Sequence, residues 1–168
     1  MTCIANDIFR EMISILQCAS FFYSRFFCEN NREIDEMKLH KLLYFAQRES
    51  FIRNDKELFP EALRAWRFGP VSIEVRDLFL TSRQASLLNR TLVISDEKDY
   101  ATLDYAYSNY AQRDSWSLSR LSHGETSWKK ARVGFSDYDN SDVLIKNSDI
   151  REDAQRIRLR RKLLGYAY

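Results

Sequence analysis

One short stretch of the 168-residue chain holds the three side-chain types of a nucleophilic triad. Ser122, His123 and Glu125 supply a hydroxyl, an imidazole and a carboxylate within four residues. A triad, however, is built by spatial convergence rather than by local order. The sequence also holds no G-x-S-x-G elbow and no cysteine in a recognisable catalytic context. We therefore interpret His123 as a histidine that hydrogen-bonds within a turn, and we expect no enzymatic activity.

Metal-binding and cofactor-binding motifs are also missing from the sequence. It contains no H-E-x-x-H pair, no C-x-x-C pair and no EF-hand loop. Asp137, Asp139 and Asp142 do cluster, but the Ser, Asn and Tyr residues between them favour a solvated loop. No glycine-rich run precedes a helix, so a phosphate cradle is not expected. The prediction is a protein without metal or cofactor.

A basic run near the C-terminus is the one strongly charged feature. Its members are Arg151, Arg156, Arg158, Arg160, Arg161 and Lys162. On a helix they would spread around much of the circumference, which is typical of a solvated helix. Binding to an acidic protein or to nucleic acid is the alternative. No tight glycine turn joins two short helices ahead of this run, so a helix-turn-helix is not predicted.

Composition and charge narrow the class of protein further. The chain carries 26 Lys and Arg against 24 Asp and Glu, a net charge of +2 that by itself predicts neither a nucleic-acid partner nor a membrane. Polar residues interrupt the longest apolar stretch, and Asp7 and Glu11 do not suit a signal peptide. Three cysteines without a C-x-x-C pair suit reduced thiols in the cytoplasm, with Cys18 and Cys28 acting as small hydrophobic residues.

Helical spacing dominates the pattern of apolar residues. The first helix is expected over 7–28, with an apolar stripe at Ile8, Met12, Ile15, Ala19, Phe22 and Phe26. A second helix is expected after Asp35 as N-cap. Its core residues would be Leu39, Leu42, Leu43 and Ala46, whereas Lys38, His40, Lys41 and Arg48 would lie on its surface or boundary.

The rest of the chain is also predicted to be mainly helical. Gly69-Pro70 would lead into a helix carrying Val75, and Ser95 would cap another. Short helices are expected near 115–122 and 126–132, and a last helix from Ser148-Asp149. Residues 61–67 and 91–94 would pair as a small two-stranded sheet. The chain has only four glycines and two prolines, too few for the many turns of an all-β fold. The predicted fold class is therefore mainly α (an α-rich α+β fold), built as a single-domain helical bundle. The domain is expected over 1–150, with a basic helix or tail packed on it over 151–168.

Aromatic residues reach 14% of the chain, more than a minimal core needs. Several fall in short or irregular segments: Trp66, Phe68, Trp116 and Trp128. We expect most of them to fill the core where loops return over it. A subset would anchor a protein interface, because Tyr, Trp and Arg dominate interface hot spots. The surplus rings are expected at Tyr44, over 100–110 and over 21–27.

Three ordered blocks resemble the Panacea domain family of SocA-like antitoxins and phage-associated proteins. They are KLHKLLYFAQ (38–47), AWRFGPVSIEV (65–75) and LSRLSHGETSWKKAR (118–132). The corresponding family patterns are K-L-x-K-L-L-Y-F, A-W-x-x-G-P-V and L-x-x-x-T-H-x-E-x-P-W-x-x-A, and the likeness covers about residues 5–155. The chain departs from them at His40 (usually Gln), Ser122 (usually Thr) and Ser127 (usually Pro). Without that proline, Glu125 or Thr126 is expected to cap the following helix.

The resemblance implies a bacterial, cytoplasmic, mostly helical antitoxin that neutralises a co-encoded toxin by direct protein contact. Some relatives resemble adaptors that deliver a toxin to a protease, and a phage regulatory protein that binds nucleic acid is a further alternative. The residues expected to define the fold are Leu39, Leu42, Leu43, Phe45, Trp66, Gly69, Pro70 and Trp128. Those expected to contact a partner are Lys38, Lys41, Tyr44, His123 and Glu125.

Overall fold

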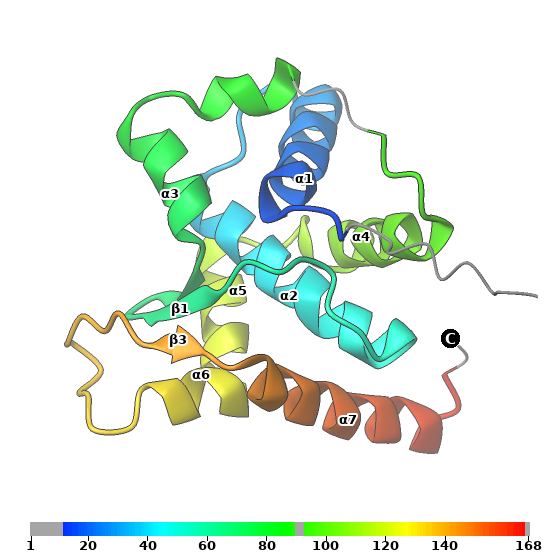
Figure 1. Ribbon diagram of the computed structural model, residues 1–168, viewed down its shortest axis with the longest axis vertical. Helices are drawn as coiled ribbons and strands as arrows, with labels where there is room; N and C mark the ends of the chain where they lie inside the picture. Colours follow the sequence, from blue (N-terminus) through cyan, green and yellow to red (C-terminus); the bar gives the residue numbers. More distant parts are fainter. Residues whose placement is uncertain (1–11, 90–92, 167–168) are drawn as a thin grey trace, which may run out of the picture.

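The computed structural model describes residues 12–89 and 93–166 as a mainly α-helical fold with one small antiparallel sheet (Figure 1). The helices are α1 (Ile15–Asn30), α2 (Glu36–Asn54), α3 (Ile73–Leu80), the 3-10 helix η1 (Gln84–Asn89), α4 (Glu97–Tyr110), α5 (Ser115–His123), α6 (Thr126–Ala131) and α7 (Asn147–Leu163). The strands are β1 (Leu63–Trp66), β2 (Gly69–Val71) and β3 (Leu144–Ile145). This architecture confirms the predicted fold class.

Helix α2 crosses the centre of the molecule, and other elements pack around it (Figure 1). Helices α1, α4, α5 and α7 all contact it, so its polar face is covered as well as its apolar one. The expected core residues are fully buried, which confirms the predicted stripe. The expectation that Lys38, His40, Lys41 and Arg48 lie on the surface is wrong, because all four are at least nine-tenths buried.

Helix α1 begins at Ile15, where Ser14 and Gln17 form a capping box. Its stripe is buried from Ile15 to Phe26, as the spacing predicts. Met12 lies before the helix and is 41% exposed, so it does not extend this stripe. Ile8 lies outside the described residues.

The sheet has the order β2-β1-β3, which corrects the predicted pairing of 61–67 with 91–94. Strands β1 and β2 form a hairpin with a two-residue loop: Trp66 lies opposite Gly69, and Arg67 and Phe68 form the tip. The second partner of β1 is β3, far along the chain. Residues 93 and 94 form no strand, and 91 and 92 lie outside the described residues. The hairpin is favoured because its loop is so short, while Gly69 takes the positive φ of +105° that the turn requires.

The later helices follow the predicted pattern with shifted ends. Asp96 rather than Ser95 caps α4, since its carboxylate accepts from the Asp99 N–H at 2.8 Å. Helices α5 and α6 lie where the sequence predicts them. Helix α7 runs continuously from Asn147 to Leu163 against α2, so the expected boundary between 150 and 151 falls inside one helix.

Two smaller expectations concern membranes and thiols. Among the residues that the structure describes, no helix is both long and apolar enough to cross a membrane. Cys18 is buried as expected, but Cys28 is exposed at the end of α1 and does not act as a core residue. Cys3 lies outside the described residues.

Candidate functional site

The three sequence blocks meet in space. Helix α2 carries the first block, the β1–β2 hairpin carries most of the second, and α5 with α6 carry the third. Strand β2 contacts both α2 and α5, and α2 contacts α5 directly. We call this meeting point the motif junction and define it by Lys41, Gly69, Ser122 and Trp128.

At the motif junction, the Lys41 side chain is 1% exposed and packs against the β1–β2 hairpin. Its Nζ donates a hydrogen bond to the Pro70 carbonyl at 3.0 Å. Burial lowers the pKa of Lys41 to about 7, despite the opposing effect of Glu36 and Asp35. A Cβ at Gly69 would stand 2.5 Å from both Lys41 Cε and Ser122 Oγ. The lysine can therefore pass this close to the hairpin only because position 69 is glycine.

Three further carbonyls of the hairpin accept hydrogen bonds from side chains of the third block. The pairs are Arg132 Nη1 with the Ala65 oxygen (3.2 Å), Trp128 Nε1 with the Trp66 oxygen (3.0 Å) and Ser119 Oγ with the Phe68 oxygen (2.9 Å). Backbone carbonyls that leave water need such donors, and a three-stranded sheet of this size supplies few. Side chains of the sequence blocks thus hold the hairpin in place and fix where its tip points.

The three triad-type groups of the sequence do not converge. Ser122 Oγ donates to the Ser119 carbonyl at 2.7 Å. The His123 ring stacks on Trp128, with centroids 4.0 Å apart and planes 11° apart. Its Nε2 is buried without a hydrogen-bond partner, and burial together with Lys41 and Arg132 lowers its pKa. His123 is therefore held as a neutral ring that stacks on Trp128, and its hydrogen bond is with the backbone of Arg67 in the hairpin rather than within its own turn.

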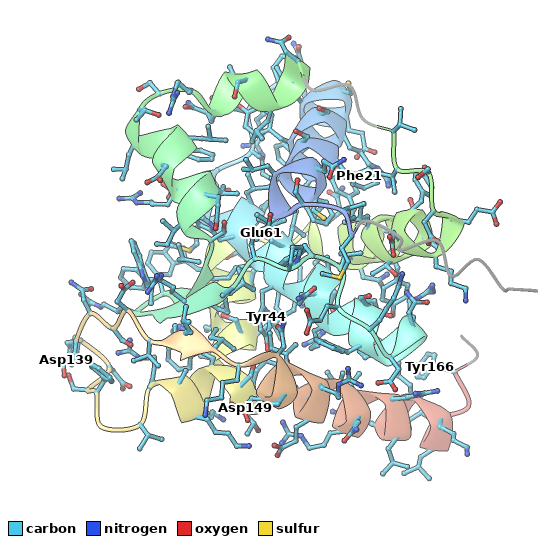
Figure 2. The ribbon with its side chains drawn as sticks, viewed as in Figure 1. Phe21, Tyr44, Glu61, Asp139, Asp149 and Tyr166 are labelled. Carbon is cyan, nitrogen blue, oxygen red and sulfur yellow. The ribbon has the colours of Figure 1, made fainter. Side chains whose placement is uncertain are left out.

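Glu125 pairs with Arg48 of α2. The same guanidinium donates through Nη2 to Tyr110 Oη at 2.7 Å. Beside this network, Tyr44 Oη and Ser127 Oγ share a hydrogen bond of 2.8 Å. Burial raises the pKa of Glu125 even though Arg48 opposes the shift, and burial also raises that of Tyr44. Figure 2 shows Tyr44 in the interior, between α2 and the helices below it.

Helix α6 receives its N-terminal cap from a distant helix. The Asp153 carboxylate of α7 accepts from the Thr126 N–H at 2.9 Å and from the Ser127 N–H at 2.8 Å. Glu125 occupies the N-cap position without a side-chain cap bond. The expectation that Glu125 or Thr126 supplies the cap is therefore wrong. The buried Asp153 caps the helix instead, and no local sequence signal reveals this role because Asp153 lies in another helix.

The structure also locates the residues expected to contact a partner. Lys38, Lys41 and Tyr44 are buried, and Lys38 Nζ donates to the Ala111 carbonyl at 3.0 Å. His123 and Glu125 are only partly exposed. Side chains placed like this cannot meet a partner on the folded surface without rearrangement, so direct contact by them stays a prediction. The residues expected to define the fold are all buried except Trp66, which is half-buried.

An exposed group of rings lies immediately outside the motif junction. Phe68 and Trp116 are 41% and 56% exposed, and their rings meet edge to face with centroids 5.4 Å apart. The Arg67 guanidinium lies over the Phe68 ring at 4.8 Å and over the Tyr138 ring at 5.4 Å. We call Arg67, Phe68, Trp116 and Tyr138 the aromatic rim. Single exposed apolar residues are ordinary, but a cluster of rings with arginine has the composition of a binding surface.

A pocket of about 340 Å³ opens beside the aromatic rim. We call it the Trp66 pocket. Its lining includes Glu36, Lys41, Trp66, Arg67, Phe68 and Arg76. Sequence reasoning missed Arg67 as a site residue. The available signal is that the family pattern leaves the two positions between Trp66 and Gly69 open, and these form the tip of the hairpin.

The basic C-terminal helix is largely engaged with the domain itself. Arg151 pairs with Asp55 at 2.7 Å, Arg156 with Asp153, and Arg161 with the fully buried Glu49 at 2.8 Å. At least three of the six basic residues thus pair with carboxylates of the same chain, which weakens the case for nucleic-acid binding.

A family model described as antitoxin SocA-like, Panacea domain, matches residues 39–129. This match spans more than half of the chain and contains all of α3, α4 and α5, together with the β1–β2 hairpin. Comparison with curated proteins and with solved structures found no match.

Proposed function

The chain belongs to the SocA-like Panacea antitoxin family, and from that premise we propose that it neutralises a co-encoded protein toxin by direct contact. The proposal confines the protein to binding, in the cytoplasm, and gives it no enzymatic step. The aromatic rim is the surface we assign to the toxin.

The observation that carries the proposal is the way the motif junction presents the hairpin tip. Lys41, Trp128 and Ser119 donate hydrogen bonds to carbonyls of the hairpin, while at its tip Phe68 is exposed and Arg67 is half-buried. A rigid tip loses little conformational entropy on binding, which favours tight association. Exposed aromatic and arginine side chains supply the usual anchors of such an interface.

The chemical groups of the motif support binding rather than catalysis. Lys41 and Glu125 each have an internal partner, and Ser122 donates to a backbone carbonyl. Within residues 12–89 and 93–166, no three His, Cys, Asp or Glu side chains lie together as a metal-binding group. The polar residues that a reaction would need are thus used to hold elements together.

The experiment begins with the adjacent open reading frame. Expressed alone, its product should arrest growth, and co-expression of this chain should restore it. The purified proteins should co-elute as one complex, and the toxin's half-life should not depend on this chain. A harmless neighbour, or two proteins that stay separate on gel filtration, would contradict the proposal. A half-life that shortens only when this chain is present would indicate a protease adaptor instead.

A further inference from the structure

The Trp66 pocket combines apolar walls with cationic groups. Trp66, Met37 and Val71 supply apolar surface, and Phe68 joins the pocket to the exposed aromatic rim. A volume of about 340 Å³ is near the lower end for ligand pockets. It suits one or two side chains of a partner better than a large cofactor.

Several donors at this pocket have unused capacity. No carboxylate of the described residues pairs with Arg67, which only stacks on rings. The buried Nε of Arg76 has no hydrogen-bond partner, although its Nη1 is paired with Glu36 at 2.7 Å. Lys41 Nζ donates one hydrogen bond, to Pro70, out of the three N–H groups that an ammonium carries.

The single carboxylate in the lining does not balance these cations. Glu36 is shared between Arg76 and His40, whose Nε2 lies 3.2 Å from it. Burial lowers the pKa of His40, so this ring is neutral near pH 7 and Glu36 offsets one cation only. Arg67 and the buried Lys41 remain, and both favour an incoming negative charge.

From these observations we infer that the Trp66 pocket receives an acidic side chain of the toxin, next to an aromatic or aliphatic side chain that packs on Phe68 and Trp116. The inference rests on the proposed function and specifies the kind of toxin surface that this chain recognises. A carboxylate would form a charge-assisted hydrogen bond with Arg67, the positive charges of Lys41 and Arg76 would favour it from within the wall of the pocket, and its apolar neighbour would cover the rings.

The first test measures affinity for the product of the adjacent gene by calorimetry. Arg67→Glu and Trp116→Ala should each weaken binding by about 30-fold or more, the loss that defines a hot spot. The matched controls are Lys162→Glu and Tyr166→Ala, which alter an exposed cation and an exposed ring near the far end of α7. Both controls should bind within about 3-fold of the unaltered chain. Equal melting temperatures would show that each variant is folded.

A second readout depends on the charge of the occupant. Lys41 faces Asp35, Glu36 and His40 at the start of α2, His123 of α5, and Arg67 and Arg76 across the pocket. An added carboxylate would favour its protonated form. Binding at pH 8 should therefore take up a proton, seen as a heat of binding that differs between phosphate and Tris buffers. Arg67→Glu, which repels the carboxylate, should remove this uptake.

The results of these binding experiments distinguish a failure of this inference from a failure of the proposed antitoxin function. If the adjacent product forms no complex with the unaltered chain, the proposed function fails first. If a complex forms but Arg67→Glu and Trp116→Ala bind as tightly as the controls, the inference is overturned and the antitoxin role stands. Binding that releases protons at pH 8 would likewise overturn a carboxylate as the occupant.

Discussion

The motif junction and the aromatic rim lie on the same hairpin, yet they differ in almost every physical property. Gly69 and Pro70 are buried, and side chains from two other parts of the chain surround them. Arg67 and Phe68, one or two residues earlier, form the tip and reach the surface. The family pattern specifies the first pair and leaves the second open. The positions that the family pattern specifies are thus those that hold the hairpin tip in place. We expect the partner surface at the open positions between them, Arg67 and Phe68.

The same contrast separates two uses of charge. Arg48, Glu125 and Glu49 are largely removed from water and paired, so each charge depends on its partner. Arg67 at the rim stacks on two rings, and no carboxylate of the described residues forms an ion pair with it. Removing one member of a buried pair leaves an uncompensated charge, whereas a rim charge can be changed with little effect on folding. The predictions below test this contrast.

The largest effect is expected from Arg48→Met. The substitution leaves Glu125 and Tyr110 Oη without their donor in a mostly buried site. The free energy of unfolding should fall by about 5 kcal/mol, the upper end for a broken buried pair, because a carboxylate and a hydroxyl both lose their donor. Urea denaturation followed by circular dichroism measures the change.

A double-mutant cycle provides the control for this pair. The double variant Arg48→Met, Glu125→Gln should lose less free energy of unfolding than the two single variants lose together, because it leaves no unpaired Glu125 charge in the buried site. Strictly additive losses would show that the two residues do not stabilise each other.

Gly69→Ala should have the next largest effect. The new Cβ would meet Lys41 Cε and Ser122 Oγ at 2.5 Å, and the φ of +105° is strained for any residue with a Cβ. Strain and overpacking together should lower the free energy of unfolding by about 2–4 kcal/mol. Gly134→Ala is the matched control, since Gly134 has a φ of +90° but nothing within 4 Å of the added Cβ. Equal losses at the two glycines would mean that crowding at the motif junction contributes nothing.

Much of the fold was predictable because local patterns determine it. The stripe of α2 and the cap at Asp35 identify that helix from sequence alone. The strand partner of β1 was not predictable in the same way. Strand β3 is two residues long and lies about 80 residues away, so it leaves no periodic pattern, and only the folded chain brings it to β1.

The candidate site was less accessible to sequence reasoning. Charged residues on a helix usually face water, so the sequence predicts that Lys41 and Arg48 lie on the surface. Burial on all sides of α2 follows from the packing of α1, α4, α5 and α7 around it, which helical periodicity does not encode. The expectation that most of Trp66, Phe68, Trp116 and Trp128 fill the core is wrong, because only Trp128 of these four is buried. The contact of Trp116 with Phe68 depends on how α5 packs on the hairpin, which the sequence does not reveal.

A smaller effect is expected from the pH dependence of Lys41. Its pKa is about 7 in the folded chain and near 10.5 in the unfolded chain, so between these values the unfolded state binds more protons. The contribution of Lys41 to stability should therefore rise as pH increases from 7 toward 10.5, by up to about 1 kcal/mol per pH unit. Subtracting the stability of Lys41→Met from that of the unaltered chain at pH 7.5 and 8.5 isolates this slope. A difference that is flat or falls with pH would show that the lysine does not lose its proton on burial.

The smallest effect on folding is expected at the aromatic rim. Trp116 is 56% exposed, and its ring contact is with Phe68, which is itself 41% exposed. Trp116→Ala should therefore change the free energy of unfolding by about 0.5 kcal/mol or less. Trp128→Ala, which removes a buried ring and its hydrogen bond to the Trp66 carbonyl, should lower the free energy of unfolding by about 3 kcal/mol. Chemical denaturation of the two variants side by side makes the comparison. If both tryptophans proved equally costly, the rim would be part of the core and could not serve as a surface kept free for a partner.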